Sequence, residues 1–246
     1  MKKSQFLLLC FLPFIGLAQA SDAGENSRNL EDRYFHLYDK LVEHQYADLD
    51  SASYYADQLL ALSKENQDSM WIAAALEGQG YVHYYREEVD QALKKFQLQK
   101  KIMLSVAMPG ELGLAYMNIA NVQSGMGESN KSILNYLEAQ KLLPKDSTYD
   151  IDRAYLNYNL ANNLVEFEDY RSAADYLKKA KEYARQEGIT DLIPSIINIE
   201  AELSLINKLP NQALKLADSA LVQSREVNDM IEELYALELR WHALTA

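Results

Sequence analysis

One pattern of polar, small and apolar positions recurs along the chain at almost equal steps. Each copy places a small residue two positions after a polar start, at residues 52, 92, 132, 173 and 213, so successive copies are 40, 40, 41 and 40 positions apart. The five copies are 50–56, 90–96, 130–136, 171–177 and 211–217. Such regularity predicts a structural repeat of about forty residues.

Two further positions in each repeat are also mostly small. Twelve residues before the first small residue stand Lys40, Gly80, Ala120, Ala161 and Ala201, and seven residues after it stand Leu59, Gln99, Ala139, Ala180 and Ala220. A short side chain lets two helix backbones approach closely where they cross. The exception, Lys40, falls in the first repeat, and terminal repeats are atypical in such proteins. Each repeat is therefore predicted to be two antiparallel helices packed together.

The prolines agree with this phase. Pro109, Pro144 and Pro210 fall between predicted helices. Pro194 falls in an opening turn, where a missing N–H breaks no intrahelical bond. The predicted helix pairs are 29–45 with 49–64, 68–86 with 89–105, 110–126 with 129–143, 149–167 with 170–187, and 190–207 with 211–226.

A last helix, predicted over 228–245, has no partner helix after it in this sequence. Its apolar face consists of Met230, Leu234, Leu237, Trp241 and Leu244. Two interpretations stay open: the helix caps the array of repeats, or the chain is the front part of a longer architecture. Trp241 stands forty residues after Ala201, where internal repeats have a small residue, and this favours the cap.

Composition supports a helical protein and limits its partners. The 246 residues include only nine Gly and five Pro, whereas folds built from short strands need many such turn residues. Lys and Arg number 24 against 36 Asp and Glu, which gives a formal net charge of −12. Because the positive charges do not cluster, this surface would repel a phosphate backbone, and we expect no nucleic-acid partner.

The amino end has the pattern of a secretory signal. Lys2 and Lys3 precede an apolar segment, 6–17, that is too short to span a membrane, and the small residues Ala18 and Ala20 follow it. We therefore expect a signal peptide over 1–20, cleaved after Ala20, and a periplasmic or secreted protein.

Removal of this signal has two consequences for the mature chain. The only cysteine, Cys10, is lost with it, so neither disulfides nor thiol chemistry can operate afterwards. No later apolar run is long enough to cross a bilayer, so we expect no transmembrane segment. The predicted organisation is a flexible stretch over 21–28 and a helical repeat domain over 29–246.

These repeats resemble the tetratricopeptide repeat (TPR) family. The third repeat matches the family's small, aromatic and proline positions best, with Ala120, Gly127, Ser132, Ile133, Tyr136, Ala139 and Pro144. The period is longer than the family's usual one and is similar to the extended repeats of bacterial extracytoplasmic regulators. The resemblance implies an all-α, right-handed TPR-like solenoid of five helix pairs followed by an unpaired C-terminal helix.

No arrangement of residues indicates catalysis, a metal or a cofactor. The histidines are His36, His44, His83 and His242. No two of them are four positions apart, so the usual zinc signature is missing. Gly78 and Gly80 follow no predicted strand and have no lysine partner, which argues against a phosphate-binding loop, and Gly127 is better explained as a turn between helices. We expect a protein that is not an enzyme and that binds no metal or cofactor.

In the TPR family the first helix of each repeat lines a concave groove, and the resemblance carries this role to particular positions. They are Glu77, Tyr81 and Tyr84, then Met117, Asn121 and Ser124, then Tyr158, Asn162 and Val165, then Asn198, Glu202 and Leu205. The side-chain amides of Asn121 and Asn162 offer both a donor and an acceptor to the backbone of an extended peptide. Tyr81, Tyr84, Met117 and Tyr158 supply apolar contact surface around them.

The predicted groove has a distinct charge. None of its positions holds Lys or Arg, so we expect it to prefer neutral or basic segments, with Glu77 and Glu202 as the acidic contributors. The alternative is that these polar residues only solvate an unused concave face.

The sequence thus predicts a non-enzymatic scaffold, exported from the cytoplasm, that binds a protein or peptide in its groove. A second class of function stays open: the extracytoplasmic sensor portion of a signal-transduction protein with a kinase, cyclase or transcriptional output. The sequence also leaves open whether the chain forms a homo-oligomer.

Overall fold

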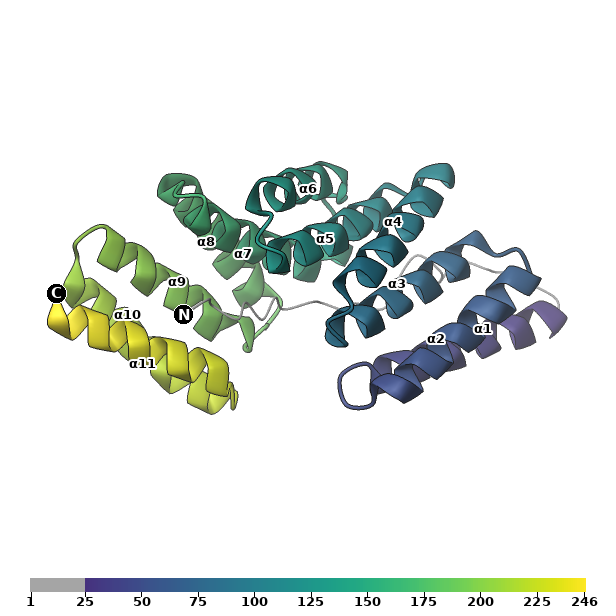
Figure 1. Ribbon diagram of the computed structural model, residues 1–246, viewed down its shortest axis with the longest axis horizontal. Coiled ribbons are helices and arrows are strands. Elements are labelled where there is room, and N and C mark those ends of the chain that lie inside the picture. Colours follow the sequence, from purple (N-terminus) through teal and green to yellow (C-terminus); the bar gives the residue numbers. More distant parts are fainter. Residues whose placement is uncertain (1–24) are drawn as a thin grey trace. The chain divides into compact units, whose positions relative to one another are not determined.

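The computed structural model describes residues 25–246, with side chains from residue 29, and divides them into two compact units. The units are residues 25–144 and residues 145–246, and each is described here by itself. Every α-helix in this part of the chain packs against the helix that follows or precedes it, as Figure 1 shows. The predicted signal peptide over 1–20 lies outside the described residues.

Unit 25–144 consists of three antiparallel helix pairs. They are α1 (Glu25–His44) with α2 (Leu49–Glu65), α3 (Ser69–Tyr85) with α4 (Val89–Ser105), and α5 (Pro109–Gly125) with α6 (Ser129–Leu142). The first helix of each pair is called the A helix below, and the second the B helix. Trp71 of α3 anchors the aromatic part of this core, because Tyr34 stacks on it at 5.0 Å and Phe35 meets it edge-on at 5.2 Å.

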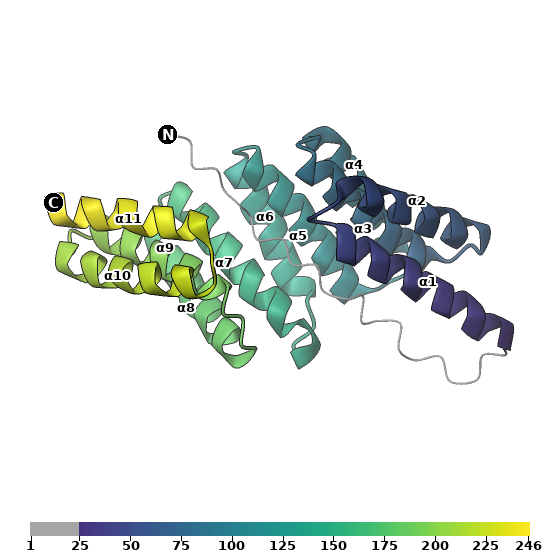
Figure 2. The ribbon, with the colours of Figure 1, turned by 90° about the horizontal axis from the view of Figure 1, so that it is seen from below.

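Unit 145–246 continues the same arrangement, and its helices are also seen from below in Figure 2. A short 3-10 helix, η2 (Ser147–Tyr149), precedes α7 (Asp150–Glu166) with α8 (Tyr170–Gln186), α9 (Leu192–Ile206) with α10 (Pro210–Glu226), and a last helix, α11 (Met230–Thr245). The last helix packs on both α9 and α10.

The predicted all-α, TPR-like solenoid of helix pairs is confirmed. All eleven predicted helices are present in the described residues, and most of their bounds agree with the prediction within two residues. The largest difference is at α1, which begins at Glu25 rather than at residue 29.

The small residues lie where the helices cross, as their spacing predicts. Ala120, Ala161 and Ala201 of the A helices are fully buried. At Gly80, a Cβ atom would lie only 2.5 Å from a ring atom of Phe96, so this crossing admits no side chain. Lys40 is the exception, since it is half-exposed and pairs with Glu43 at 2.6 Å.

A and B helices are buried to different extents. Every B helix has a narrow buried stripe with spacings of four, three and four residues. In α2 it is formed by residues 52, 56, 59 and 63, in α4 by 92, 96, 99 and 103, and in α10 by 213, 217, 220 and 224. The internal A helices α3, α5, α7 and α9 are instead buried on most sides, so their polar side chains must find partners inside the protein.

Except at the α1–α2 and α6–α7 links, the turns between the helices of residues 25–246 share one construction. Residues with positive φ follow one another at twenty-residue steps, at 67, 87, 107 and 127 in unit 25–144 and at 168, 188, 208 and 228 in unit 145–246. Around Glu87, for example, the N–H of Glu88 donates to the carbonyl of His83 at 2.9 Å, which closes the end of α3. Gly127, with φ of 74°, is confirmed as such a turn, but only Gly188 among the other seven is also glycine.

The link from α6 to α7 departs from this construction. It contains Pro144 and η2, and none of its residues has positive φ. The single 41-residue step of the repeat spans this link, and the two units divide here.

Candidate functional site

The twelve positions of the predicted groove all lie on A helices, in two sets. Unit 25–144 holds Glu77, Tyr81 and Tyr84 on α3 with Met117, Asn121 and Ser124 on α5, and unit 145–246 holds Tyr158, Asn162 and Val165 on α7 with Asn198, Glu202 and Leu205 on α9. Asn121 and Asn162, the two amides predicted to act on one peptide, therefore belong to different units. The structure tests no binding role, so the groove stays a prediction.

A buried network joins α3, α4 and α5, and we call Glu77, Tyr81, Gln99 and Asn118 the α3–α5 polar cluster. The Tyr81 hydroxyl donates to Asn118 Oδ1 at 2.7 Å. The Asn118 amide in turn donates to Glu77 Oε1 at 2.8 Å and, more weakly, to Gln99 Oε1 at 3.5 Å. Each hydrogen bond joins two helices, so the cluster fixes the packing of three helices in unit 25–144.

Glu77 is the only ionisable carboxyl of this cluster, and it is closed off from solvent. Only 8% of Glu77 is exposed, and this burial raises the pKa of its carboxyl, while the hydrogen bond from Asn118 opposes the shift. A carboxyl with these surroundings is better suited to holding helices together than to attracting a partner.

The other predicted groove residues of unit 25–144 also have internal contacts. Asn121 is 3% exposed, and its side-chain oxygen accepts a hydrogen bond from the hydroxyl of Tyr136. Met117 is buried. Tyr84 is partly exposed, although burial raises the pKa of its hydroxyl.

A second network joins α9 to α11 in unit 145–246, and we call Asn198, Glu202, Glu232 and Tyr235 the α9–α11 polar cluster. The Asn198 amide donates to Glu232 Oε2 at 2.7 Å and to the Glu232 carbonyl at 3.0 Å. The Tyr235 hydroxyl donates to Glu202 Oε2. Both carboxylates are held by uncharged donors, and both residues are partly exposed.

Electrostatics link this cluster to Tyr158 of α7. Burial raises the pKa of Tyr158 above its ordinary value, and the negative charge of Glu232 raises it further. Burial likewise raises the pKa of Tyr235, with the charge of Glu202 as the next cause. Burial also raises the pKa of Glu232, so a proton or an external cation would stabilise this group. The neighbouring Asn162, also on α7, is partly exposed.

Four members of the two clusters were not among the predicted site residues: Gln99, Asn118, Glu232 and Tyr235. Gln99 occupies the third small position of its repeat, and that departure from the pattern was the signal that it faces a polar neighbour. Glu232 stands on the buried stripe of α11 with Ala236, Leu239 and Ala243, at the same spacings of four, three and four as in the B helices. Extending that stripe to the last helix would have placed Glu232 against α9.

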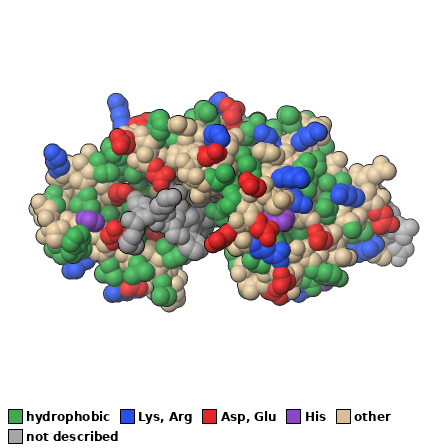
Figure 3. Space-filling view, viewed as in Figure 1, with side chains coloured by type: hydrophobic (Ala, Val, Ile, Leu, Met, Phe, Trp, Pro, Cys, Tyr) green, Lys and Arg blue, Asp and Glu red, His purple; other side chains and the backbone are tan. Residues whose placement is uncertain are grey.

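Charge is distributed unequally between the two kinds of helix. The A helices α3, α5 and α9 contain no Lys or Arg, whereas α4 contains four Lys and α8 contains three Lys and two Arg. On the face drawn in Figure 3, acidic and basic side chains alternate with hydrophobic ones and form no continuous basic field. Cationic side chains thus lie mainly on B helices, and the A-helix sites are acidic or neutral.

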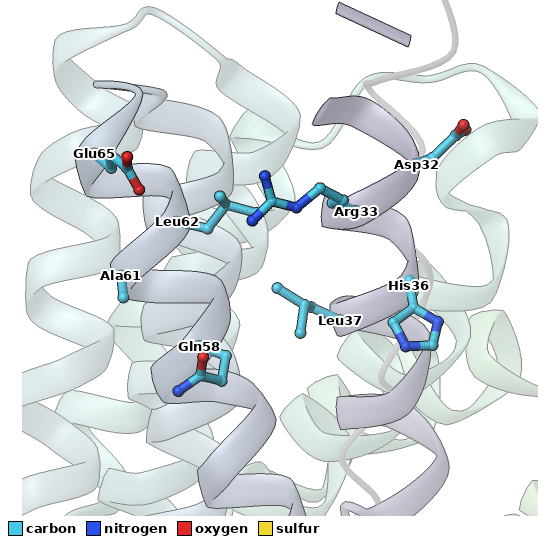
Figure 4. Close-up of a pocket in the computed structure, with 8 residues that line it drawn as sticks. All are labelled: Asp32, Arg33, His36, Leu37, Gln58, Ala61, Leu62 and Glu65. Carbon is cyan, nitrogen blue, oxygen red and sulfur yellow. The ribbon is translucent and has the colours of Figure 1, made fainter. Parts of the chain in front are cut away.

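A cleft of about 430 Å³ lies between α1 and α2. It is lined by Asp32, Arg33, His36, Leu37, Gln58, Ala61, Leu62 and Glu65. Figure 4 shows the Arg33 side chain reaching from α1 toward Leu62 on α2, while Asp32 points away. The cleft is open, and its one guanidinium shares it with the carboxylates of Asp32 and Glu65, so no arrangement for acid–base or nucleophilic catalysis is apparent there.

Within residues 25–246, no three His, Cys, Asp or Glu side chains are grouped so that they could hold a metal ion. Within the same residues, no helix combines the length and the apolarity needed to cross a membrane.

Stacked antiparallel helix pairs with small residues at their crossings define a TPR-like α-solenoid. No family model matches the chain, and no curated protein matches its sequence. Solved structures do match its fold. RapI in its apo form is 13% identical, with 87% of this chain and 85% of RapI covered and a TM-score of 0.60.

Two further structures show the same likeness. BtubC from P. vanneervenii is 15% identical, with 88% of this chain and 87% of BtubC covered and a TM-score of 0.59. A chain of the Cut9–Hcn1 hetero-tetramer of the APC/C is 15% identical, with 88% of this chain but 46% of that chain covered and a TM-score of 0.50. At these identities the comparisons establish the fold alone.

Proposed function

We propose that this protein is an exported, non-enzymatic interaction scaffold whose α9–α11 polar cluster binds a neutral or basic peptide segment of a partner protein. The observation that carries this proposal is the pair of partly exposed carboxylates, Glu202 on α9 and Glu232 on α11. Their hydrogen-bond donors, Tyr235 and Asn198, are uncharged and do not cancel the negative charge.

The distribution of cations supports the same proposal. No Lys or Arg stands on α9, so a Lys or Arg of a bound segment would meet carboxylates there without a competing cation on the same helix. Asn162 of α7 is partly exposed and adds an amide to the site, whereas Tyr158 and Asn198 are buried. An extended peptide offers backbone groups to the amide and a positive side chain to the carboxylates.

Peptide binding by a protein comprising residues 21–246 tests this proposal, because these residues contain every described helix. Fluorescence anisotropy would compare basic, neutral and acidic peptides of equal length. We expect Glu202→Gln to weaken binding of the basic peptide by about tenfold, and added salt to weaken it as well. Glu182→Gln, an exposed residue of α8, is the matched control and should leave binding unchanged.

Two outcomes would exclude the α9–α11 polar cluster as the binding site. One is tighter binding of the acidic peptide than of the basic one, and the other is equal affinity of wild type and Glu202→Gln for the basic peptide. Asn121→Ala is a poorer probe, because it also removes the buried contact with Tyr136.

Export is the second part of the proposal, and the pattern of residues 1–20 supports it. Expression of the full chain in a bacterium, followed by amino-terminal sequencing of the periplasmic or secreted protein, should give a mature protein that begins at Ser21. A full-length protein retained in the cytoplasm would contradict this part and leave the binding site to be judged on the peptide data.

A further inference from the structure

The last helix, α11, has two contrasting faces. Its inner stripe is buried, with Ala236 packed near Ile197 and Ala220, and Leu239 packed near Ala201 and Ala217. Its outer face is apolar as well but faces solvent. The exposed fractions there are 74% for Met230, 65% for Leu234, 40% for Leu237, 61% for Trp241 and 58% for Leu244.

The repeat shows what kind of element covers such a face. Forty residues earlier, on α9, the equivalents of Leu237 and Trp241 are Ile197 and Ala201, both buried. They are covered by α10, which runs antiparallel to α9 and contributes Ala217 and Ala220 to the contact. A helix face of a repeat protein that stays in contact with water is usually polar, whereas this face of α11 is apolar. Its outer face is therefore built to receive a helix.

The spacing of the apolar residues specifies the same kind of partner. The steps from Met230 to Leu234, Leu237, Trp241 and Leu244 are four, three, four and three residues. This is the seam of a coiled coil, in which a single facing helix inserts its own side chains between those of the first. Four of these five residues are more than half exposed. The seam thus offers a continuous apolar row of the kind that forms the centre of a helix–helix interface.

The charged residues beside the seam favour antiparallel over parallel pairing of two copies. Glu233 flanks the seam on one side, with Arg240 seven residues later on the same side, and Glu238 flanks it on the other. Parallel pairing of two copies would bring Glu233 opposite Glu238 of the second copy, which is repulsive. Antiparallel pairing brings Glu233 opposite Arg240 of the second copy, and the two-fold axis repeats this attraction.

We propose that α11 pairs with α11 of a second copy in an antiparallel, two-fold symmetric dimer. Leu234 then packs on Leu237 of the second copy, and Trp241 packs on Met230 of the second copy. Glu233 and Arg240 already pair within the chain with Arg225 at 2.8 Å and Asp218 at 2.7 Å. The side chains of Glu233 and Arg240 are 28% and 44% exposed, so both can also reach an opposite charge across the interface. The arrangement gives α11 the antiparallel neighbour that α9 has in α10.

The mass of the protein comprising residues 21–246 in solution tests the dimer. Analytical ultracentrifugation at about 100 µM should give twice the mass of one chain, which corresponds to a dimer dissociation constant below that concentration. Leu234→Glu should raise the dimer dissociation constant by about tenfold or more, because it places a charge in the seam. The matched control is Leu104→Glu on α4, since Leu104 is 66% exposed, almost the same as Leu234.

The control variant should remain a dimer, and circular dichroism should show the same helix content in all three proteins. A wild-type monomer at this concentration would overturn the proposal. A helix of another protein or of a longer chain would then be the candidate to cover the exposed face of α11. A dimer that Leu234→Glu does not weaken would overturn it too.

Cysteine pairing tests the orientation, because residues 21–246 contain no native cysteine. A mixture of the Leu234→Cys and Leu237→Cys variants should form a disulfide between the two variants under mild oxidation. Preferential cross-linking of Leu234→Cys to itself would instead show parallel pairing and overturn the antiparallel dimer.

Discussion

The α3–α4 crossing of unit 25–144 and the α9–α10 crossing of unit 145–246 occupy the same place in the repeat but are filled differently. In the first, Gly80 faces the ring of Phe96. In the second, the equivalent residues are Ala201 and Ala217, and Leu239 of α11 packs beside both. In the first region a large ring lies against a residue without a side chain, whereas in the second two small residues leave room that Leu239 fills.

The same two regions differ in polarity one turn away from the crossing. Three residues before Gly80 stands Glu77, a buried carboxyl, and three residues before Ala201 stands Asn198, an amide. Each residue forms a hydrogen bond with another helix. Glu77 accepts one from Asn118 of α5, and Asn198 donates one to Glu232 of α11. The acidic group is thus enclosed in the first region and lies nearer the surface in the second. This difference makes the second region the better candidate for binding.

Removal of the Phe96 side chain should change stability more than any other substitution at these two crossings. Phe96→Ala creates a cavity at a fully buried site and should lower the free energy of unfolding by about 3–5 kcal/mol. Urea unfolding followed by circular dichroism measures the change. A loss below 1 kcal/mol would show, contrary to the packing described, that the helices close over the gap.

Enlarging Gly80, the small residue of the crossing, should change the free energy of unfolding by a smaller amount. The sign of this change depends on the residue at position 96. Gly80→Ala should cost about 1–3 kcal/mol in the wild type, because the new methyl group meets the Phe96 ring. In the Phe96→Ala background the same substitution should stabilise, because it recreates the Ala–Ala pair of α9 and α10.

A double-mutant cycle in urea measures this reversal. Gly125→Ala is the matched control, since its Cβ would meet only the Tyr84 hydroxyl at 3.5 Å, an ordinary contact. It should be neutral or stabilising in both backgrounds, and an additive cycle at Gly80 would refute direct contact with Phe96.

The two polar positions should differ in their response to pH. The folded-state pKa of Glu77 is raised by burial, so its contribution to stability is fully present below the unfolded-state pKa and is lost as pH rises through the folded-state pKa. Glu77→Gln, which keeps the acceptor for Asn118, should therefore become more stable relative to wild type between about pH 5 and pH 8. Thermal or urea unfolding at both pH values tests this, and a constant difference would mean that Glu77 stays ionised in the fold.

The smallest expected effect concerns the turns that follow the helices. Ala107 has φ of 56°, in the left-handed region that is unfavourable for a residue with a side chain. Ala107→Gly should stabilise the protein by about 1 kcal/mol, and Gly127→Ala, at φ of 74°, should destabilise it by a similar amount. Opposite shifts in Tm would confirm that both residues make the same turn, whereas shifts of the same sign would argue against it.

The helix positions could be predicted from the sequence because small residues recur at each point where two helices cross. Ala120, Ala161 and Ala201 set the phase of the repeat, and the helices follow from it. The enclosure of Glu77 could not be predicted in this way, because it depends on the Asn118 amide, which the following repeat supplies. The repeat pattern shows which side chains share a helix face but does not show how deeply the next helix covers that face.

The α9–α11 polar cluster was harder to predict for a related reason. Glu232 and Tyr235 stand on α11, where Trp241 replaces the small residue that marks the phase elsewhere. The turns could not be predicted either, because Glu87 and Ala107 are not glycine, the residue type by which left-handed turns are most readily recognised. Only Gly127 and Gly188 carry that signal.

The uniform turns have a consequence for how such a chain can change its length. Because the joints before α3 and before α5 share one backbone shape, excision of residues 69–108 would bring together two ends that already fit. Duplication of the same segment would likewise add a module without a new kind of junction. Gain or loss of whole modules is therefore easier for this architecture than insertion of a few residues, which would shift every later crossing out of phase.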